Sequence, residues 1–399
     1  MNYLLCDEPA VRRQLLPFTF TRPVALLRVG ITTLQEKWNL FLGEDGGFVT
    51  EGYLQERFGN RVEEQNLLVN ASFIADKALA DAVKALPQNG ILVKDGQWIA
   101  FYASAAQLAD LTLRNCLSGR EPVEYSGGCL QIRHPWDIFT LNGKQIGEDL
   151  AQLDPSRSDA SWKGEGTVQF GECPVYAEEG ARVLHTLIDT TQGPVYLGRN
   201  ARIMPSSLVQ GPLALCEGSL IKMGSKIYGG NTFGPHCKVA GEVESTVMLG
   251  YSNKAHDGFL GDAVLGEWCN LGAGTNCSNL KNDYSPVRVW SYAEERFVKT
   301  GLQFCGLLMG DHSKSAIGTQ FNTGTVVGVG CNVFGAGFPK NFIPSFTWGR
   351  ETYRVERAIE TARIVYARRE RNFTEADAEV LRAVYAQTIG NRERDQQEV

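Results

Sequence analysis

The chain has 399 residues, of which 43% are hydrophobic, and a formal net charge of −6. This length allows two or three domains, and the acidic balance gives no reason to expect nucleic acid or an anionic membrane surface as a partner. Residues 1–9 lack the apolar core of a signal peptide, and no apolar run reaches the roughly 20 residues of a membrane helix, so we expect a cytoplasmic protein. The ten cysteines are scattered without a Cys-x-x-Cys pair, which favours free thiols over disulfides or a zinc site.

Residues 1–155 alternate short apolar strands with amphipathic helices. This alternation predicts an α/β domain with a mainly parallel sheet and helices on its faces. The expected strands and helices are, in chain order, strand 3–6, helix 33–41, strand 47–50, strand 66–69, helix 76–85, strand 90–94, helix 105–115 and helix 136–153. Residues 156–180 begin with a polar, turn-rich stretch and are predicted to be a linker and the entry to the next domain.

A repeat of six residues characterises the stretch 181–347. Apolar side chains stand at eight consecutive positions six residues apart: Leu197, Ile203, Val209, Leu215, Ile221, Ile227, Phe233 and Val239. A period of six matches neither an α-helix nor an alternating strand, and it predicts a solenoid whose coils have three flat faces of one hexapeptide each. One apolar side chain per face would stack along the axis, with glycine and small residues at the corners.

The phase of this repeat slips after Val239 and resumes at Phe259 and again at Phe321. Slips predict loops that leave the coils, the two largest around 241–254 and 279–303. In solenoids, insertions on one face commonly build the binding site. After Trp348 the repeat ends, and residues 348–399 are predicted to hold two helices, 351–371 and 374–389, that cap the last coil.

The stretch 254–279, KAHDGFLGDAVLGEWCNLGAGTNCSN, indicates the chemistry. It resembles the acetyltransferase half of the bifunctional N-acetylglucosamine-1-phosphate uridyltransferase / glucosamine-1-phosphate acetyltransferase family. That family has a histidine shortly before a Leu-Gly-Asp-Ala step and an Asn-Ile-Gly-Ala-Gly-Thr coil after it. His256, residues 260–263 and residues 270–275 match these motifs. The resemblance implies a left-handed parallel β-helix that transfers an acetyl group from acetyl-CoA to an amino-sugar phosphate.

The resemblance also implies roles for single residues. His256 would be the general base that takes a proton from the sugar amine, because imidazole titrates close to neutral pH. Asn270 would orient the sugar, and Phe259 stands where the family usually has a tyrosine that contacts it. The Ala273 backbone would meet the pantetheine arm of the coenzyme. The other expected cofactor contacts are Asn279 and Leu280. His312 is expected to be a corner residue, with a position near the cofactor on a later coil as the alternative. The pairs His236-Cys237 and Cys269-Cys277 lack the spacing of metal ligands and are expected to be core or surface residues.

The sugar phosphate requires cations. Lys226, with Lys222 nearby, corresponds best to an arginine that grips the phosphate in the family. A second family lysine, just upstream of the histidine, appears here as Glu244, and Lys254 or Arg288 could substitute for it from another direction.

The first 155 residues resemble the nucleotidyltransferase half of the same family, in a shortened and altered form. Thr21-Arg22 and Gly30 preserve an echo of the glycine-rich phosphate loop, but the glycines that would wrap a triphosphate are missing. The magnesium-binding Gly-Asp of the family appears as Asn70-Ala71, and an amide is a poor magnesium ligand. The stretch 134–142 resembles the Pro-Trp-Asp step of these domains, so Asp137 is a candidate metal or sugar ligand. Arg22 is the best candidate for a phosphate clamp, with a structural ion pair as the equal alternative.

Three functional hypotheses follow. The first is a bifunctional enzyme that acetylates glucosamine 1-phosphate and then condenses the product with UTP, with Mg²⁺ as cofactor. The second retains one of these activities, either acetyl transfer with a vestigial nucleotide domain or nucleotidyl transfer to another sugar phosphate. The third is a non-catalytic hexapeptide scaffold, which would have no need of His256 beside the 270–275 coil. A homotrimer is implied by the family, whose active sites lie between neighbouring solenoids.

Overall fold

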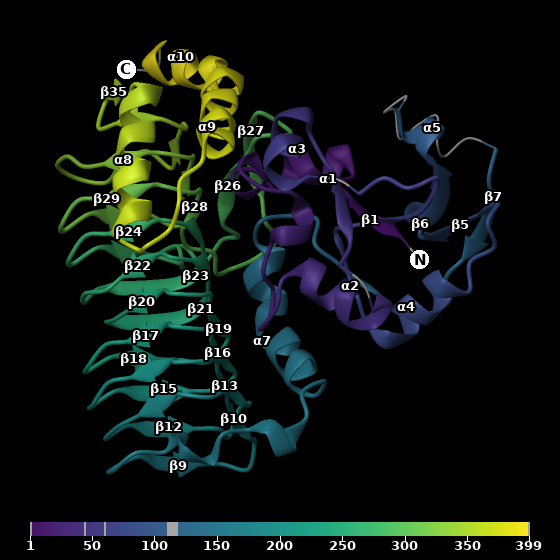
Figure 1. Cartoon of the computed structure of the whole chain (residues 1–399). Coiled ribbons are helices and arrows are strands. Elements are labelled where there is room, and N and C mark those ends of the chain that lie inside the picture. Colours follow the sequence, from purple (N-terminus) through teal and green to yellow (C-terminus); the bar gives the residue numbers. More distant parts are fainter. Residues whose placement is uncertain (1, 44, 60, 110–118, 398–399) are drawn as a thin grey trace. The chain divides into compact units, whose positions relative to one another are not determined.

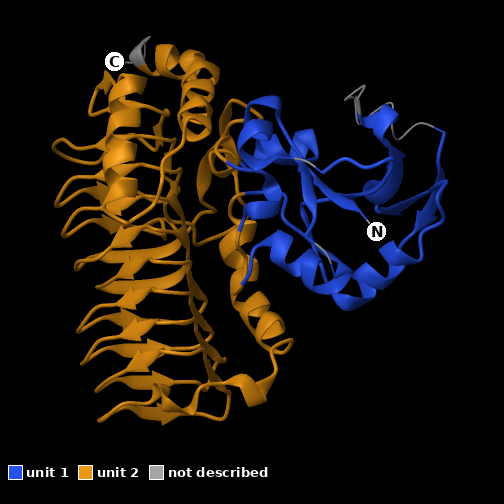
Figure 2. Ribbon diagram, in the orientation of Figure 1, with its two compact units in different colours: residues 1–15, 22–27, 32–134 blue, residues 16–21, 28–31, 135–399 orange. Residues whose placement is uncertain are grey.

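The structure is a computed structural model that describes residues 2–43, 45–59, 61–109 and 119–397. The chain divides into two compact units, which are shown in different colours in Figure 2. Unit 1 comprises Met1–Leu15, Arg22–Leu27 and Thr32–His134, and unit 2 comprises Leu16–Thr21, Arg28–Ile31 and Pro135–Val399. Across the described ranges, no helix combines the length and the apolar character that a membrane crossing requires.

Unit 1 contains a six-stranded sheet with the strands β2 (Gly47–Val49), β1 (Tyr3–Cys6), β3 (Gln65–Asn70), β6 (Gln97–Ser104), β5 (Gly90–Lys94) and β7 (Glu121–Glu124) in that order. Parallel pairing joins β1 to β2 and β3, and β5 to β7, as the alternating pattern predicts. The sheet is nevertheless mixed, because β6 runs antiparallel to both β3 and β5. Sequence analysis missed β6. Its signal is the dipeptide Asp95-Gly96, whose positive φ angles of 47° and 75° suit a two-residue hairpin turn.

Three helices of unit 1, α1 (Pro9–Gln14), α2 (Leu34–Leu42) and α4 (Lys77–Lys84), begin at a side-chain cap. Thr33 and Glu36 form a capping box, and Gly43 ends the same helix in the left-handed conformation. Further helices are α3 (Gly52–Phe58) and α5 (Ala105–Ala109), and the short strands β4 (Phe73–Ile74) and β8 (Leu130–Gln131) pair with each other. Residues 110–115 of the expected helix 105–115 lie outside the described residues.

Unit 2 is built on a parallel β-solenoid, as the six-residue repeat predicts (Figure 1). Successive coils pair in register, and residues that are paired from coil to coil form what we call a column. The first face has the strands β10 (Val175–Ala177), β13 (Val195–Leu197), β16 (Leu213–Leu215), β19 (Asn231–Phe233), β28 (Leu308–Met309), β31 (Val326–Val327) and β33 (Phe342–Ile343). The second face has β11 (Arg182–Val183), β14 (Arg202–Ile203), β17 (Leu220–Ile221), β20 (Lys238–Val239), β22 (Asn253–Lys254), β24 (Asn270–Leu271), β29 (Lys314–Ser315), β32 (Asn332–Val333) and β34 (Thr347–Trp348). The third has β9 (Val168–Phe170), β12 (Leu187–Asp189), β15 (Leu208–Gln210), β18 (Lys226–Ile227), β25 (Asn276–Cys277) and β30 (Gln320–Phe321).

The first of the two expected loops does not leave the coils. Residues 242–250 form the long strand β21 (Glu242–Gly250), which pairs with β18 through its first half and with β19 through its second half. The phase slips because this coil is short: Phe233 pairs with Met248, only 15 residues later, whereas Leu215 pairs with Phe233, 18 residues later. The strand β23 (Phe259–Glu267) follows the same path in the next coil. The prediction of a loop at 241–254 is therefore wrong.

The second expected loop is confirmed. Between β25 and β28 the chain leaves the solenoid and forms the antiparallel hairpin β26 (Arg288–Ser291) and β27 (Arg296–Lys299). A bridge between Leu280 and Phe304 closes the base of this insertion.

Helix α7 (Asp137–Leu150), which the sequence grouped with the first domain, packs along the solenoid and belongs to unit 2. Asn142 of α7 donates from Nδ2 to the Gly230 carbonyl (2.9 Å), and its Oδ1 accepts from the Gly30 amide (2.7 Å). Thr232 Oγ1 contacts both the Gly30 carbonyl (2.9 Å) and Asn142 Oδ1 (3.0 Å). These bonds attach segment 28–31 to the coil that contains β19.

The carboxyl-terminal helices α8 (Val355–Ala367), α9 (Glu375–Gln387) and α10 (Ile389–Gln397) follow the last coils, after a small hairpin of β34 with β35 (Glu351–Thr352). Tyr366 of α8 stacks on Trp268 with 3.9 Å between ring centroids, and Trp268 stacks on Tyr251 at 4.3 Å. Tyr251, Trp268 and His312 are corner residues with positive φ angles, so His312 stands at a corner as expected. This series of rings fastens α8 to the side of the solenoid.

Candidate functional site

The predicted base, His256, lies on an exposed loop of residues 255–258 between β22 and β23, which we call the histidine loop. All four backbone carbonyls of the loop accept hydrogen bonds. The donors, for residues 255 to 258 in order, are Lys222 Nζ (3.0 Å), Lys254 Nζ (2.7 Å), the Gly274 amide (3.1 Å) and the Glu242 amide (3.2 Å). The backbone that carries the imidazole is therefore held on both sides by neighbouring coils.

The two predicted sugar contacts lie on the coils next to this loop. Asn270, at the start of β24, is exposed and pairs with Asn253, whose Nδ2 donates to Asn270 Oδ1 (3.3 Å). Phe259, at the start of β23, is half-buried, and its amide donates to Asn276 Oδ1 (2.8 Å). Phe259 thus lies on the strand that follows the histidine loop. Asn270 lies on the next coil, beside the strand that precedes the loop.

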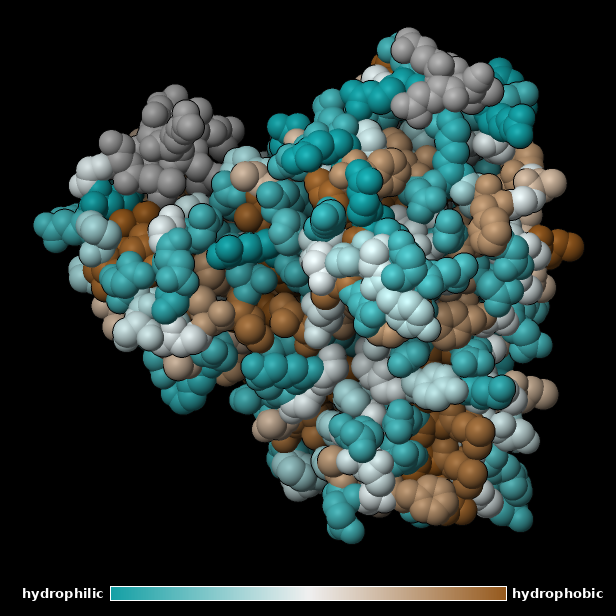
Figure 3. All heavy atoms as spheres, turned by 180° about the vertical axis from the view of Figure 1, so that it is seen from behind, coloured by the Kyte–Doolittle hydropathy of each residue, from teal (hydrophilic) through white to brown (hydrophobic). Residues whose placement is uncertain are grey.

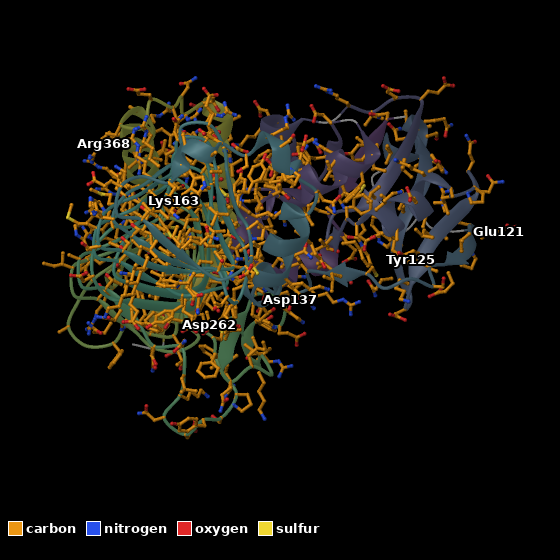
Figure 4. All side chains as sticks on the ribbon, turned by 90° about the horizontal axis from the view of Figure 1, so that it is seen from below. Glu121, Tyr125, Asp137, Lys163, Asp262 and Arg368 are labelled. Carbon is orange, nitrogen blue, oxygen red and sulfur yellow. The ribbon has the colours of Figure 1, made fainter. Side chains whose placement is uncertain are left out.

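A small cluster forms around Gly261. A Cβ atom at this glycine would lie 2.7 Å from the Phe259 ring and 2.8 Å from Asn279 Nδ2. Asn279 donates from Nδ2 to Asp262 Oδ2 (2.7 Å), and the Asp262 carbonyl accepts from the Gly306 amide. Figure 4 shows Asp262 on the solenoid. The structure therefore brings the predicted residues Phe259 and Asn279 together at the base of the insertion.

The electrostatics of this region are set by burial. Burial raises the pKa of Asp262 to about 6, against the lowering effect of the Asn279 hydrogen bond, and the charge of Glu244 raises it further. Burial likewise lowers the pKa of Lys254 to about 8, against the opposing charge of Asp257. Lys254 is only 2% exposed, whereas the sequence suggests it only as a replacement phosphate ligand.

The predicted cofactor contacts lie on the coil after the histidine loop. Ala273 is half-buried, and its carbonyl accepts from the Gly318 amide (2.7 Å) of the next coil. A Cβ at the neighbouring Gly272 would lie 2.4 Å from the Ala316 backbone, so glycine is required there by the close approach of the coils. Leu280 lines a polar hollow of about 660 Å³ beneath the insertion hairpin, together with Lys281 and Arg288.

The predicted phosphate cations have different surroundings. Lys226 is exposed on β18, but its register partner on β21 is Glu242, which in turn pairs with Phe259. Lys222 donates to the histidine loop, as described above. Arg288 donates from a guanidinium nitrogen to the Phe297 carbonyl (3.2 Å) within the insertion hairpin.

The candidate residues of the amino-terminal half fall in different units. Arg22, which is 5% exposed, belongs to unit 1. Asp137, at the start of α7, belongs to unit 2 and is labelled in Figure 4. Thr21, also in unit 2, is buried and donates from Oγ1 to Asp311 Oδ2 (2.7 Å). The segment that resembles a phosphate loop therefore binds the solenoid through Thr21 and Gly30.

A buried polar cluster that sequence analysis missed lies at the carboxyl end of β1. Asp7 Oδ1 accepts from the Val24 amide (2.8 Å), and Oδ2 accepts from Thr50 Oγ1 (2.6 Å) and lies 3.4 Å from Arg12 Nε. Burial raises the pKa of Asp7 to about 6 despite these partners. The sequence feature that could have revealed this cluster is an acidic residue directly after a buried strand, a position where ligands commonly bind in α/β sheets. Here that carboxylate is occupied by groups of the protein itself.

Comparison with known proteins agrees with a chain that contains two different units. Residues 3–158 match the family model described as sugar nucleotidyl transferase. A bifunctional protein GlmU from Methanocaldococcus jannaschii is 27% identical over 249 residues, which are 62% of this chain and 50% of that protein. A bifunctional sugar-1-phosphate nucleotidylyltransferase/acetyltransferase from Sulfurisphaera tokodaii is 25% identical over 212 residues, 53% of this chain and 46% of that protein.

These matches span about half the length of the curated relatives. They agree with the resemblance in the 254–279 motif and with the fold, an α/β unit joined to a parallel β-helix. The chain is thus similar to GlmU-like bifunctional nucleotidyltransferases and acetyltransferases, and its residues 3–158 match the sugar nucleotidyl transferase family model.

Proposed function

We propose that this protein is a transferase that acetylates glucosamine 1-phosphate with acetyl-CoA, with His256 as the general base. The observation that carries the proposal is the histidine loop: an exposed imidazole stands on a backbone whose four carbonyls are all hydrogen-bonded. Such a loop presents a base in a fixed orientation, and Asn270 and Phe259 offer polar and apolar contacts for a sugar beside it.

Acetyl transfer requires a base beside the acceptor amine, and in this proposal the histidine loop supplies it. The sugar amine must be neutral to attack the thioester carbon of acetyl-CoA. As the C–N bond forms, His256 takes the amine proton. The C–S bond then breaks, and the departing thiolate takes a proton from the imidazolium, so that the coenzyme leaves as its thiol and His256 becomes neutral again. Asn270 would hold the sugar so that the amine faces both the imidazole and the thioester.

Acetyl-CoA would lie along the coils that follow Ala273. In this direction the last coils carry a hollow of about 340 Å³, which is lined by Phe334, Phe338, Lys340 and Arg350 among others. Phe338 is 67% exposed. Aromatic rings and cations suit the adenine and phosphate ends of the coenzyme, and the glycine-rich 272–274 coil would let the pantetheine arm approach the backbone. Asn279 and Leu280 would border this arm. We assign the sugar phosphate to Lys226, because Lys222 is engaged with the loop and Arg288 with the Phe297 carbonyl.

The first test follows the free thiol that is released from acetyl-CoA in the presence of glucosamine 1-phosphate. We expect His256→Ala to lower the rate by roughly 10²–10⁴-fold and to leave the thermal unfolding curve unchanged, because an exposed loop side chain contributes little to the core. His185→Ala, at another exposed histidine of the solenoid, is the matched control and should keep the wild-type rate. No thiol release by the wild type at enzyme-like rates would defeat the proposal.

Nucleotidyl transfer from UTP to N-acetylglucosamine 1-phosphate is the second candidate, and the family match at residues 3–158 favours it. The residues at the expected metal position do not fit a magnesium ion. Asn70 Nδ2 donates to the Trp98 carbonyl (3.1 Å), and its Oδ1 accepts from the amide and hydroxyl of Ser72 (3.2 and 2.7 Å). Acetyl transfer is therefore the function that the geometry supports better.

Pyrophosphate release decides this second candidate. The protein is incubated with N-acetylglucosamine 1-phosphate, Mg²⁺ and each nucleoside triphosphate in turn. Release with UTP supports the bifunctional enzyme, and release with a different triphosphate changes the nucleotide. Without release from any of them, the proposal is restricted to acetyl transfer.

The proposal includes a homotrimer in the reducing cytoplasm. Val168, Leu187 and Leu208 are paired in register and exposed, so they form an apolar row on one face of the early coils. Figure 3 shows apolar side chains gathered on the lower part of the solenoid. Such a row favours a contact with a second copy of the chain. Light scattering coupled to size exclusion would give the mass of the assembly.

A further inference from the structure

One column of the solenoid contains a lysine where aliphatic side chains are expected. Ile203, Ile221, Val239 and Lys254 are paired in register in four successive coils of the second face. The first three fill the interior, and Lys254, which is equally buried, takes the same inward position in the fourth. The backbone of Lys254 thus keeps the position that the repeat predicts, but its side chain is a cation where the repeat has an aliphatic residue.

The space around this amine is shaped for it. Nζ donates to the His256 carbonyl at 2.7 Å. A Cβ on Gly241, in the coil before, would lie 2.9 Å from Nζ and 3.0 Å from the Asp257 Cα atom, and Gly241 has a φ of 82°. A larger residue at 241 would therefore push the amine or the histidine loop out of place.

Stability does not account for the lysine. An ammonium group that is moved from water into an apolar interior loses solvation, and one hydrogen bond to a carbonyl and one nearby carboxylate replace it incompletely. An aliphatic side chain, such as those in the three preceding coils, would fill the column at lower free energy. The benefit of Lys254 must lie in what its amine holds.

We propose that Lys254 is a positioning residue, whose amine grips the backbone of His256 from inside the solenoid. Lys222 acts on the preceding carbonyl, that of Ala255, at 3.0 Å from the outer side. The two amines together fix the histidine loop, so that the imidazole keeps one orientation toward the acceptor amine. This inference rests on the proposed role of His256 as general base.

Lys254→Met tests the proposal, because methionine fills the column but donates no hydrogen bond. We expect its melting temperature to equal or exceed that of the wild type. Hydrogen exchange of the Glu242 and Gly274 amides, the two backbone donors to the histidine loop, should become at least about tenfold faster. The kcat of acetyl transfer should fall roughly 10–100-fold, since a displacement of about 1 Å is enough for that, while the KM for acetyl-CoA changes less than about threefold.

Lys314→Met is the matched control. Lys314 Nζ donates to the carbonyl of His312 at 2.9 Å, on a later coil. This histidine precedes its lysine by two residues, whereas His256 follows Lys254 by two. This variant should leave exchange of the Glu242 and Gly274 amides at the wild-type rate. Lys254→Gln retains a donor and should restore part of both the exchange protection and the kcat that Lys254→Met loses.

The outcomes separate this inference from the function on which it rests. If Lys254→Met keeps wild-type exchange of the Glu242 and Gly274 amides and wild-type kcat, the positioning role is overturned. If both Lys254 variants fail to fold, it is also overturned, because the amine would then serve stability. If the wild type transfers no acetyl group but Lys254→Met still loosens the loop, the proposed function fails and the role of Lys254 in holding the loop remains.

Discussion

The carboxyl group of Asp262 lies half-buried at the base of the insertion, with a pKa of about 6 in the folded chain against an ordinary value of 3.8. Because the folded state keeps its proton to higher pH than the unfolded state, the stability contributed by this group is full below about pH 4 and is lost as the pH rises through about 6. Asp262→Asn removes the charge and retains an oxygen that accepts from Asn279. We expect this variant to gain about 1–2 kcal/mol over the wild type at pH 7.5 and nothing at pH 4.

Urea unfolding at both pH values measures this difference. Asp283→Asn is the control with the opposite sign, because hydrogen bonds from Ser285 lower the pKa of Asp283. Its carboxylate stabilises the fold above its ordinary pKa, so this variant should lose stability at pH 7.5 and not at low pH. A gain for Asp262→Asn that is the same at every pH would show that the charge is not responsible.

At the residue scale, the sequence indicates the types of residue in the site more readily than their partners. The motif around His256 could be recognised because its residues are adjacent in the chain. The bond from Lys222 to Ala255 joins residues 33 positions apart across a short coil, and no local pattern encodes that spacing. The sequence suggests Lys254 as a phosphate ligand because a lysine near a phosphate site is normally exposed, and only the register shows that it points inward.

At the scale of elements, the ring stack that fastens α8 is a separable contribution to stability. Tyr366 is 7% exposed and packs on Trp268 and, edge-on, against Phe373. Tyr366→Ala should lower the free energy of unfolding by about 2–4 kcal/mol, because it removes a buried ring and leaves a cavity beside an indole. Tyr366→Phe keeps the stack and should stay within about 1 kcal/mol of the wild type. Equal losses in the two variants, measured by chemical denaturation, would assign the effect to the hydroxyl.

The elements themselves were predictable where the pattern is periodic. Eight aliphatic or aromatic positions at a spacing of six define the coils between Leu197 and Val239, and each of these side chains is in the core. The short coil was missed because a loop and a continuous strand produce the same phase slip in the sequence. Strand β6 was missed because its buried residues follow no strict alternation, although the Asp95-Gly96 turn before it carried a usable signal.

At the scale of the whole molecule, unit 2 includes two short segments from the beginning of the chain, so a domain boundary in one place does not exist. Gly30 depends on this arrangement. It has a φ of 85°, and a Cβ there would lie 2.5 Å from Asp149 Oδ2 and 2.9 Å from the Gln145 backbone of α7. Gly30→Ala should therefore cost about 2–4 kcal/mol, through both backbone strain and a steric clash.

Gly43→Ala isolates the strain from the clash. Gly43 has a similar φ of 80°, but among the described residues no heavy atom beyond its own helix and chain neighbours lies within 4 Å of the place that a Cβ would take, so the expected loss is only about 1 kcal/mol. The difference between the two variants, read from their denaturation midpoints, measures the fit of segment 28–31 against α7. Equal losses would mean that this segment has room to move.

The two anchors of the beginning of the chain sit on different coils: Gly30 is bound to Thr232 on the coil of β19, and Thr21 to Asp311, three coils later. With about 4.8 Å between neighbouring strands, the anchors are about 14 Å apart along the axis. Repeat proteins usually gain and lose whole coils during evolution. Here a duplication between the anchors would move one of them away from its partner unless residues 22–29 changed their present conformation, so homologues are expected to vary in coil number before β19 or after β28, and to keep the count in between constant.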